Sequence, residues 1–149
     1  MDLFEELMQV VGLLDGAEVD YALVGGLAVG VWGAPRATKD IDLLVQAQDV
    51  IRAQEALRPA GYTLDALPKR FTDGMQLQRI NKLADGQLST VDLIVVDESL
   101  APVWASCSRH ATEVGSLSVE SRDGLIAMKL AAGRPQDQAA VIRLQELDR

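Results

Sequence analysis

The sequence predicts a mixed α/β domain, with one central sheet of mixed strand direction flanked by helices. Three observations lead to this fold class. Helical patterns open and close the chain, short apolar strands alternate with helices between them, and the alternation lacks the strict repeat of an all-parallel sheet. The chain has 149 residues, enough for one domain with its own core, so we expect a single domain over residues 1–149.

The first half of the chain alternates between amphipathic helices and short apolar strands. Apolar residues recur at helical spacing from Leu3 to Leu14, with Gly16 just past the end. Pro59 and Gly61 stop the last helix of this half. The expected elements are a helix at 2–15, a strand at 21–24, a short helix at 27–32, a loop at 33–38, a strand at 40–45 and a helix at about 48–58.

The second half contains a hairpin and closes with two helices. Asp85-Gly86 is a favoured two-residue hairpin turn between apolar runs. Gly133 and Pro135 separate the last two helices in a stop-then-start arrangement. The expected elements are an irregular, mobile loop at 62–74, strands at 75–83 and 87–96, a short helix at 100–107, a strand or hairpin arm at 112–120, and helices at about 123–132 and 136–147.

Composition narrows the class of protein. The net charge is −8, which argues against unaided capture of a polynucleotide, because such binding needs a basic stripe. One cysteine and one histidine exclude an internal disulfide framework and a His-rich metal cluster. The N-terminus is acidic where a signal peptide would be basic, and no apolar run is long enough to span a bilayer. We expect a cytoplasmic protein with no membrane partner.

Three carboxylates form the most informative pattern. Asp40 and Asp42 are two residues apart in an expected strand, so they point to the same face with α-carbons roughly 6.6 Å apart. Asp92 lies in the apolar run 90–96, and the three converge if the two strands are neighbours. Such a cluster suits Mg²⁺ or Mn²⁺ and can hold two ions. Taken singly, each acid also fits a solvated strand end or an edge strand.

The pair Gly25-Gly26 ends an apolar strand and precedes an expected helix. Glycines at such a place let the backbone approach a ligand closely and turn N–H groups toward an anion. A lone glycine pair is also compatible with a simple tight turn. Because the pair and the aspartates both lie at strand ends, we expect a phosphate cradle and a metal cluster on one edge of one sheet.

The stretch from Leu23 to Asp42 resembles the first motif of polymerase-β-like nucleotidyltransferases. Within them it is most similar to a minimal bacterial branch related to AbiEii-type toxins of toxin–antitoxin systems. The resemblance implies that Gly25 and Gly26 contact the triphosphate of an NTP, and that Asp40 and Asp42 hold metal with Asp92 as the third carboxylate.

The stretch 122–137 resembles later motifs of that branch, which implies roles for Lys129, Arg134 and Asp137. Lys129 lies in a helix that is apolar almost all round, so we expect it to be buried against a phosphate or carboxylate, or to reach the helix end. Asp137 either points inward or caps its helix. Arg36 and Thr38 precede the aspartates, where they would contact phosphate or the metal ligands.

These patterns predict a nucleotidyltransferase that moves a nucleoside monophosphate from an NTP to an acceptor with the help of Mg²⁺ or Mn²⁺. The acceptor stays open among a tRNA 3′ end, a protein hydroxyl and a small molecule. Two other hypotheses remain: a non-catalytic module that binds NTP or metal and regulates a partner, and a catalytic subunit that needs a separate partner. The expected partners are an antitoxin, a substrate-binding chain or a second copy in a homodimer.

Overall fold

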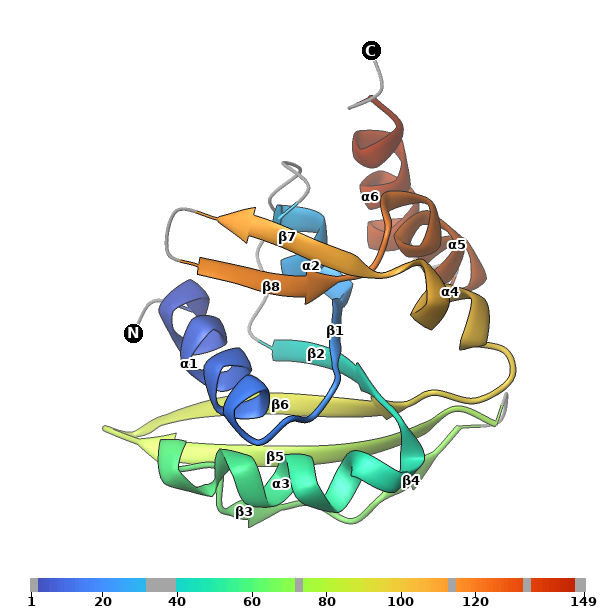
Figure 1. Ribbon diagram of the computed structural model, residues 1–149. Coiled ribbons are helices and arrows are strands. Elements are labelled where there is room, and N and C mark those ends of the chain that lie inside the picture. The colour runs from blue at the N-terminus through green and yellow to red at the C-terminus, as the bar shows by residue number, and fades with distance from the viewer. Residues whose placement is uncertain (1–2, 32–39, 72–73, 113–114, 133–134, 147–149) are drawn as a thin grey trace.

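The computed structural model describes residues 3–31, 40–71, 74–112, 115–132 and 135–146. One mixed sheet runs through this part of the chain, and helices pack against it (Figure 1). Its strands are β1 (Ala22–Val24), β2 (Asp40–Val45), β3 (Leu64–Asp65), β4 (Lys69–Arg70), β5 (Gln76–Ala84), β6 (Gln87–Val95), β7 (Ser108–Thr112) and β8 (Gly115–Val119). The α-helices are α1 (Leu3–Gly16), α2 (Gly25–Val31), α3 (Val50–Leu57), α4 (Ala101–Ser106), α5 (Arg122–Ala132) and α6 (Pro135–Glu146).

The strands lie in the order β3-β5-β6-β2-β1-β8-β7, and β4 also pairs with β5. The pairs β2–β6 and β1–β8 are parallel, whereas the other strand pairs are antiparallel. This mixture confirms the predicted fold class. The strand carrying Asp92 lies inside the sheet and next to the strand carrying Asp40 and Asp42, which is the condition under which the three carboxylates converge.

Most predicted elements are present, with three differences. α2 begins at Gly25 rather than after the glycine pair. The region 62–74, expected as an irregular loop, contains β3 and β4, because its backbone pairs with the outer side of β5. The strand β7 was not predicted, since its sequence is mostly polar and it lies at the edge of the sheet. The expected loop 33–38 lies outside the described residues.

Apolar residues pack on both faces of the sheet. The larger cluster joins Leu7 and Leu14 of α1 and Leu57 of α3 to strand residues such as Leu43, and α1 and α3 contact each other on that side (Figure 1). A smaller cluster on the opposite face lies under α4 and includes residues of β1, β2, β5 and β6. Its members within strands and helices are Ala22, Val24, Leu44, Leu77, Ile94, Val103, Trp104 and Met128.

The hairpin β5–β6 turns at the predicted dipeptide. Asp85 and Gly86 both have positive φ, 53° and 74°, as a two-residue turn between twisted strands requires. This turn fixes the register of the two strands, beginning with Ala84 opposite Gln87.

Each helix in the described ranges is too short or too polar to cross a bilayer.

Candidate active site

The sheet brings the predicted carboxylates together on one face. In the parallel pair β2–β6, Asp42 lies opposite Asp92, and Asp40 lies opposite Thr90. Side chains at paired positions of neighbouring strands stand side by side on the same face. This face also carries Leu44, two residues after Asp42, so the carboxylates adjoin the smaller apolar cluster. Asp92 is buried, whereas Asp40 and Asp42 are half-buried.

Gly25 forms one wall of this site. Val24 pairs with Asp42 across β1 and β2, and the next residue, Gly25, has a φ of +74°. A Cβ on Gly25 would lie 2.3 Å from Oδ2 of Asp42, so both the backbone angle and the neighbouring carboxylate require glycine here. Gly26 follows as a buried residue of α2. The glycine pair and the aspartates therefore adjoin, as the sequence predicted.

Arg79 of β5 occupies the third place in the row and was not predicted. Its Nε donates to Oδ1 of Asp92 at 2.8 Å, and its Nη2 donates to Oδ2 at 3.0 Å. These bonds raise the pKa of Arg79 above the usual value of a guanidinium, and the nearby charges of Asp40 and Asp42 add to the shift. The guanidinium thus neutralises part of the negative charge of three carboxylates.

A neutral pair extends the row toward the hairpin tip. The hydroxyl of Thr90 donates to Oδ1 of Asn81 at 2.8 Å, and the two residues are paired across β5 and β6. Because Thr90 also lies opposite Asp40, this face offers polar groups beside the acids. Reading across the strands, the site is a row of Asn81–Thr90–Asp40 next to a row of Arg79–Asp92–Asp42.

Carboxylate oxygens are the donors that Mg²⁺ and Mn²⁺ prefer. Asp40, Asp42 and Asp92 therefore fit such an ion by their chemistry, and Asp92 is a buried anion that requires a positive partner. Among the described residues, however, no three Asp, Glu, His or Cys side chains are gathered closely enough to ligate one ion. The described arrangement instead gives both oxygens of Asp92 to Arg79.

The remaining predicted residues are only partly placed. Arg36, Thr38 and Arg134 lie outside the described residues. Lys129 belongs to α5 and Asp137 to α6, and only the backbone of these two positions is described. α5 packs against α2, the helix that begins at Gly25.

The helix α5 is less buried than its sequence predicted. Leu125 is fully buried, but Leu130 is 58% exposed. The expectation that this helix is buried therefore holds at Leu125 and is wrong at Leu130.

Sequence reasoning missed Arg79, although a signal for it was present. With a two-residue turn at Asp85-Gly86, Ala84 pairs with Gln87, and each step away from the turn pairs the next residue of each strand. This register places Arg79 opposite Asp92. An arginine directly opposite a buried aspartate is a favourable cross-strand pair. The hairpin prediction thus already contained the partner of the third carboxylate.

The strand order and the row of carboxylates beside a glycine turn define a polymerase-β-like nucleotidyltransferase fold, shared with solved structures of that class. Residues 6–83, which are 78 of the 149 residues, match the family model of aminoglycoside-2''-adenylyltransferase. The chain belongs to this family. No curated relative matches the sequence.

Three solved structures illustrate the likeness. The protein TM1012 of Thermotoga maritima is 15% identical, with a TM-score of 0.67 over 99% of this chain and 94% of that one. The lincosamide antibiotic adenylyltransferase LnuA, solved with lincomycin, is 15% identical, with a TM-score of 0.67 and 96% of each chain covered. ANT(2")-Ia, solved with adenylyl-2"-tobramycin, is 13% identical, with a TM-score of 0.64 over 97% and 91% of the chains.

Proposed function

We propose that this chain transfers AMP from ATP to a hydroxyl group of a small, positively charged acceptor of the aminoglycoside type, with Mg²⁺ or Mn²⁺. The observation that carries the proposal is the row of Asp42 and Asp92 beside Gly25 in a member of an adenylyltransferase family. Two similar folds were solved with lincomycin and with adenylyl-2"-tobramycin, which supports a small-molecule acceptor.

The roles follow from the positions of the groups. The acceptor oxygen attacks the α-phosphorus of ATP, the bond to the bridging oxygen breaks, and pyrophosphate leaves with that electron pair. Asp92 accepts the hydroxyl proton at a carboxylate oxygen, and the backbone at Gly25 and Gly26 cradles the triphosphate. Asp40, Asp42 and Asp92 would hold the metal, which neutralises phosphate charge and activates the attacking oxygen. Lys129 and Arg134 would balance the charge of the triphosphate, a proposal that rests on the sequence resemblance.

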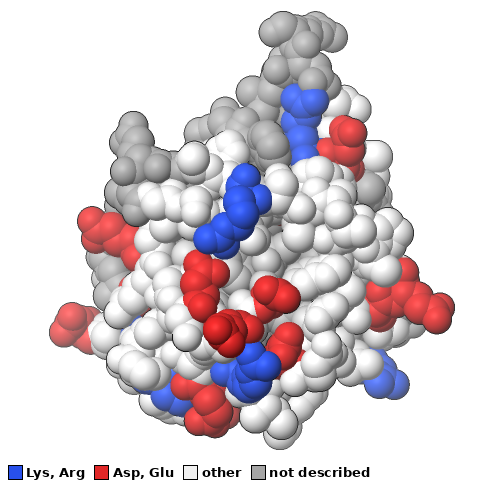
Figure 2. All heavy atoms as spheres, in the orientation of Figure 1, with Lys and Arg blue, Asp and Glu red and all other residues white. Residues whose placement is uncertain are grey.

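Charge favours a cationic acceptor over a polynucleotide. Three carboxylates, of Asp40, Asp42 and Asp92, adjoin the guanidinium of Arg79 in the site, and the whole chain has a net charge of −8. On the face seen in Figure 2, acidic side chains gather beside separate basic ones, and the described residues there form no continuous basic stripe. A polynucleotide backbone is normally bound by such a stripe.

The other hypotheses become outcomes of one test. Transfer to a tRNA 3′ end or to a protein hydroxyl would instead favour a function like that of the AbiEii-type toxins that the sequence resembles. Binding of ATP without transfer would favour the regulatory module or the subunit that needs a partner. The carboxylate row beside Gly25 is compatible with each of these, so the acceptor must be measured directly.

The experiment is to incubate the full chain with α-³²P-ATP, Mg²⁺ or Mn²⁺, and separately with tobramycin, lincomycin, bulk tRNA or a protein extract. We expect label on tobramycin. In Asp42→Asn the rate should fall by about 100-fold or more, because the site loses a negative charge with which it would hold the metal ion.

Asp65→Asn is the matched control, since Asp65 is an exposed carboxylate of the same sheet, bound to Arg58. It should transfer at the rate of the unchanged chain. Full activity in Asp42→Asn would defeat the proposed site. Label on tRNA or protein alone would defeat the proposed acceptor while keeping the chemistry.

A further inference from the structure

Arg79 lies where the proposed function needs a metal ion. Its guanidinium holds both oxygens of Asp92, at 2.8 and 3.0 Å, and a two-pronged bond of this kind is among the strongest ionic contacts in proteins. The Asp92 side chain is 6% exposed, whereas that of Arg79 is 36% exposed. The buried carboxylate of Asp92 is therefore neutralised by the guanidinium of Arg79, a side chain of β5 that is more exposed than Asp92.

A divalent ion and this guanidinium would compete for the same carboxylate. Mg²⁺ binds a carboxylate oxygen at roughly 2.0–2.1 Å and demands a regular arrangement of ligands. A guanidinium that uses both oxygens occupies the directions in which the carboxylate accepts best. Two cations on one side chain would also repel each other across a short distance.

The neighbouring acids strengthen the hold of Arg79. Asp42 is paired with Asp92 on β2, and Asp40 lies two residues earlier on the same face. Both contribute to the raised pKa of Arg79, so the guanidinium interacts favourably with the whole group. Removing it would leave three carboxylates with less positive charge nearby, which is the condition that favours a divalent ion.

We propose that Arg79 is a positioning residue that occupies Asp92 in place of the metal, and that the ion must displace its guanidinium to reach this carboxylate. This inference rests on the proposed function, since it takes Asp92 as a ligand. Its consequence is a weak affinity of the unmodified chain for the free ion. The affinity is set by the contact between β5 and β6 as well as by the acids themselves.

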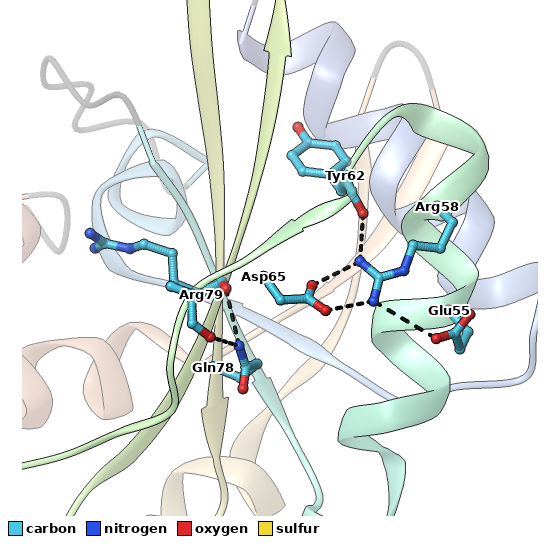
Figure 3. Close-up of polar contacts among 7 residues, drawn as sticks. Glu55, Arg58, Tyr62, Asp65, Gln78 and Arg79 are labelled. Atoms are coloured by element: carbon cyan, nitrogen blue, oxygen red, sulfur yellow. Dashed lines mark hydrogen bonds and ion pairs between the residues drawn. The ribbon is translucent and has the colours of Figure 1, made fainter.

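The same chain offers a matched control. Arg58, which follows α3, binds both carboxylate oxygens of Asp65 of β3 through Nη1 and Nη2, each at 2.8 Å. Arg79 likewise binds both oxygens of Asp92, through Nε and Nη2. Figure 3 shows the Arg79 side chain extending away from the Arg58–Asp65 pair. Replacing Arg58 removes one guanidinium and one two-pronged ion pair from the same part of the sheet without touching the carboxylate row.

The experiment measures Mn²⁺ binding to the metal-free full chain without nucleotide, from the electron paramagnetic resonance signal of the free ion. We expect Arg79→Gln to bind Mn²⁺ about tenfold or more tightly than the unchanged chain, because the ion no longer has to break a charge-assisted bond. Arg79→Lys should also bind more tightly, since one ammonium cannot hold both oxygens. Arg58→Gln should leave the affinity unchanged, and circular dichroism checks that each variant is folded.

Each outcome decides the inference. In one outcome, the unchanged chain binds Mn²⁺, Asp42→Asn loses this binding, and Arg79→Gln and Arg79→Lys bind Mn²⁺ no more tightly than the unchanged chain. That outcome would overturn the role of Arg79 and spare the proposed function. Absence of Mn²⁺ binding in every variant would overturn both. If Arg58→Gln gains as much affinity for Mn²⁺ as Arg79→Gln, the gain comes from the change in net charge alone. That outcome would overturn the inference too.

Discussion

Strand β5 carries two ion pairs three residues apart, one on each face of the sheet. Lys82 binds Glu6 of α1 on the core face, and Arg79 binds Asp92 on the site face. Lys82 and Glu6 are 9% and 4% exposed, whereas Arg79 is 36% exposed. Both members of the first pair are therefore buried, whereas in the second pair the arginine is partly exposed and only Asp92, at 6%, is buried.

The two pairs also differ in their balance of charge. Around Glu6, the hydroxyl of Tyr62 donates to Oε1 at 2.7 Å, and the ammonium of Lys82 lies 5.1 Å from the centre of the Tyr62 ring. Burial, together with Glu6, raises the pKa of Tyr62 far above its usual range, so this hydroxyl stays a donor. One anion is matched by one cation there, whereas Arg79 faces three carboxylates. The balanced pair supports the fold, whereas Arg79 leaves part of the negative charge of the three carboxylates without compensation.

Breaking the buried pair should have the largest effect on stability. Lys82→Met keeps the length of the side chain but leaves the charge of Glu6 buried with the Tyr62 hydroxyl as a remaining donor. We expect a loss of about 3–5 kcal/mol in the free energy of unfolding, as found when one partner of a buried pair is removed. Urea unfolding followed by circular dichroism measures it.

The double variant Glu6→Gln/Lys82→Met tests the cause. It removes the buried charge together with its partner, so most of the lost stability should return. If the double variant is as unstable as Lys82→Met, the loss comes from packing around the lysine stem rather than from an unpaired carboxylate.

On the site side, Gly25→Ala should be the most damaging small change, and Gly86 provides its control. Both glycines have a φ of +74°, but a Cβ at Gly86 would meet nothing within 4 Å, whereas one at Gly25 would lie 2.3 Å from Asp42. We expect Gly25→Ala to cost about 1–3 kcal/mol more than Gly86→Ala, because only the first crowds a neighbour.

Activity separates these two variants further. Displacement of the Asp42 carboxylate should abolish AMP transfer in Gly25→Ala, while Gly86→Ala should keep the rate of the unchanged chain after allowance for folded fraction. Equal losses of stability and activity in the two variants would mean that backbone strain alone requires glycine at position 25.

The features of the site face were easier to predict from the sequence than those of the core face. The strand with Asp40 and Asp42, the Asp85-Gly86 turn and the inner position of Asp92 follow from local spacing, because two-residue periodicity and turn chemistry act within a few residues. These parts of the site were therefore predictable, and even Arg79 follows from the register of the hairpin. The parallel pairing of β2 with β6 entered the prediction only as a condition, because it joins distant parts of the chain.

The core-face network was not predictable in this way. Glu6, Tyr62 and Lys82 come from three separate parts of the chain. Tyr62 follows Glu6 by 56 residues, and Lys82 follows it by 76. No local pattern marks a glutamate on an amphipathic helix as the partner of a strand lysine, because their meeting depends on how α1 and α3 pack on the sheet. The edge strand β7 escaped prediction for a related reason, since its polar sequence acquires a strand conformation through pairing with β8.

The smallest expected effect concerns the exposed pair of Arg58 and Asp65, whose side chains are 27% and 39% exposed. The hydrogen bond from Arg58 lowers the pKa of Asp65 below its ordinary value of 3.8. A carboxyl group with a lowered pKa in the folded state stabilises the fold above its unfolded pKa. That contribution disappears as the pH falls through the folded pKa.

Arg58→Gln should therefore cost about 0.5 kcal/mol at neutral pH, because solvent screens such an exposed pair. The difference between this variant and the unchanged chain should shrink as the pH falls below 3.8 and vanish once Asp65 is protonated in both. Urea unfolding at a series of pH values, with Asp65→Asn as the variant that lacks the titrating group, measures the difference. A constant difference down to strong acid would mean that Arg58 stabilises the fold through its bond to the carbonyl oxygen of Tyr62, at 2.9 Å, rather than through Asp65.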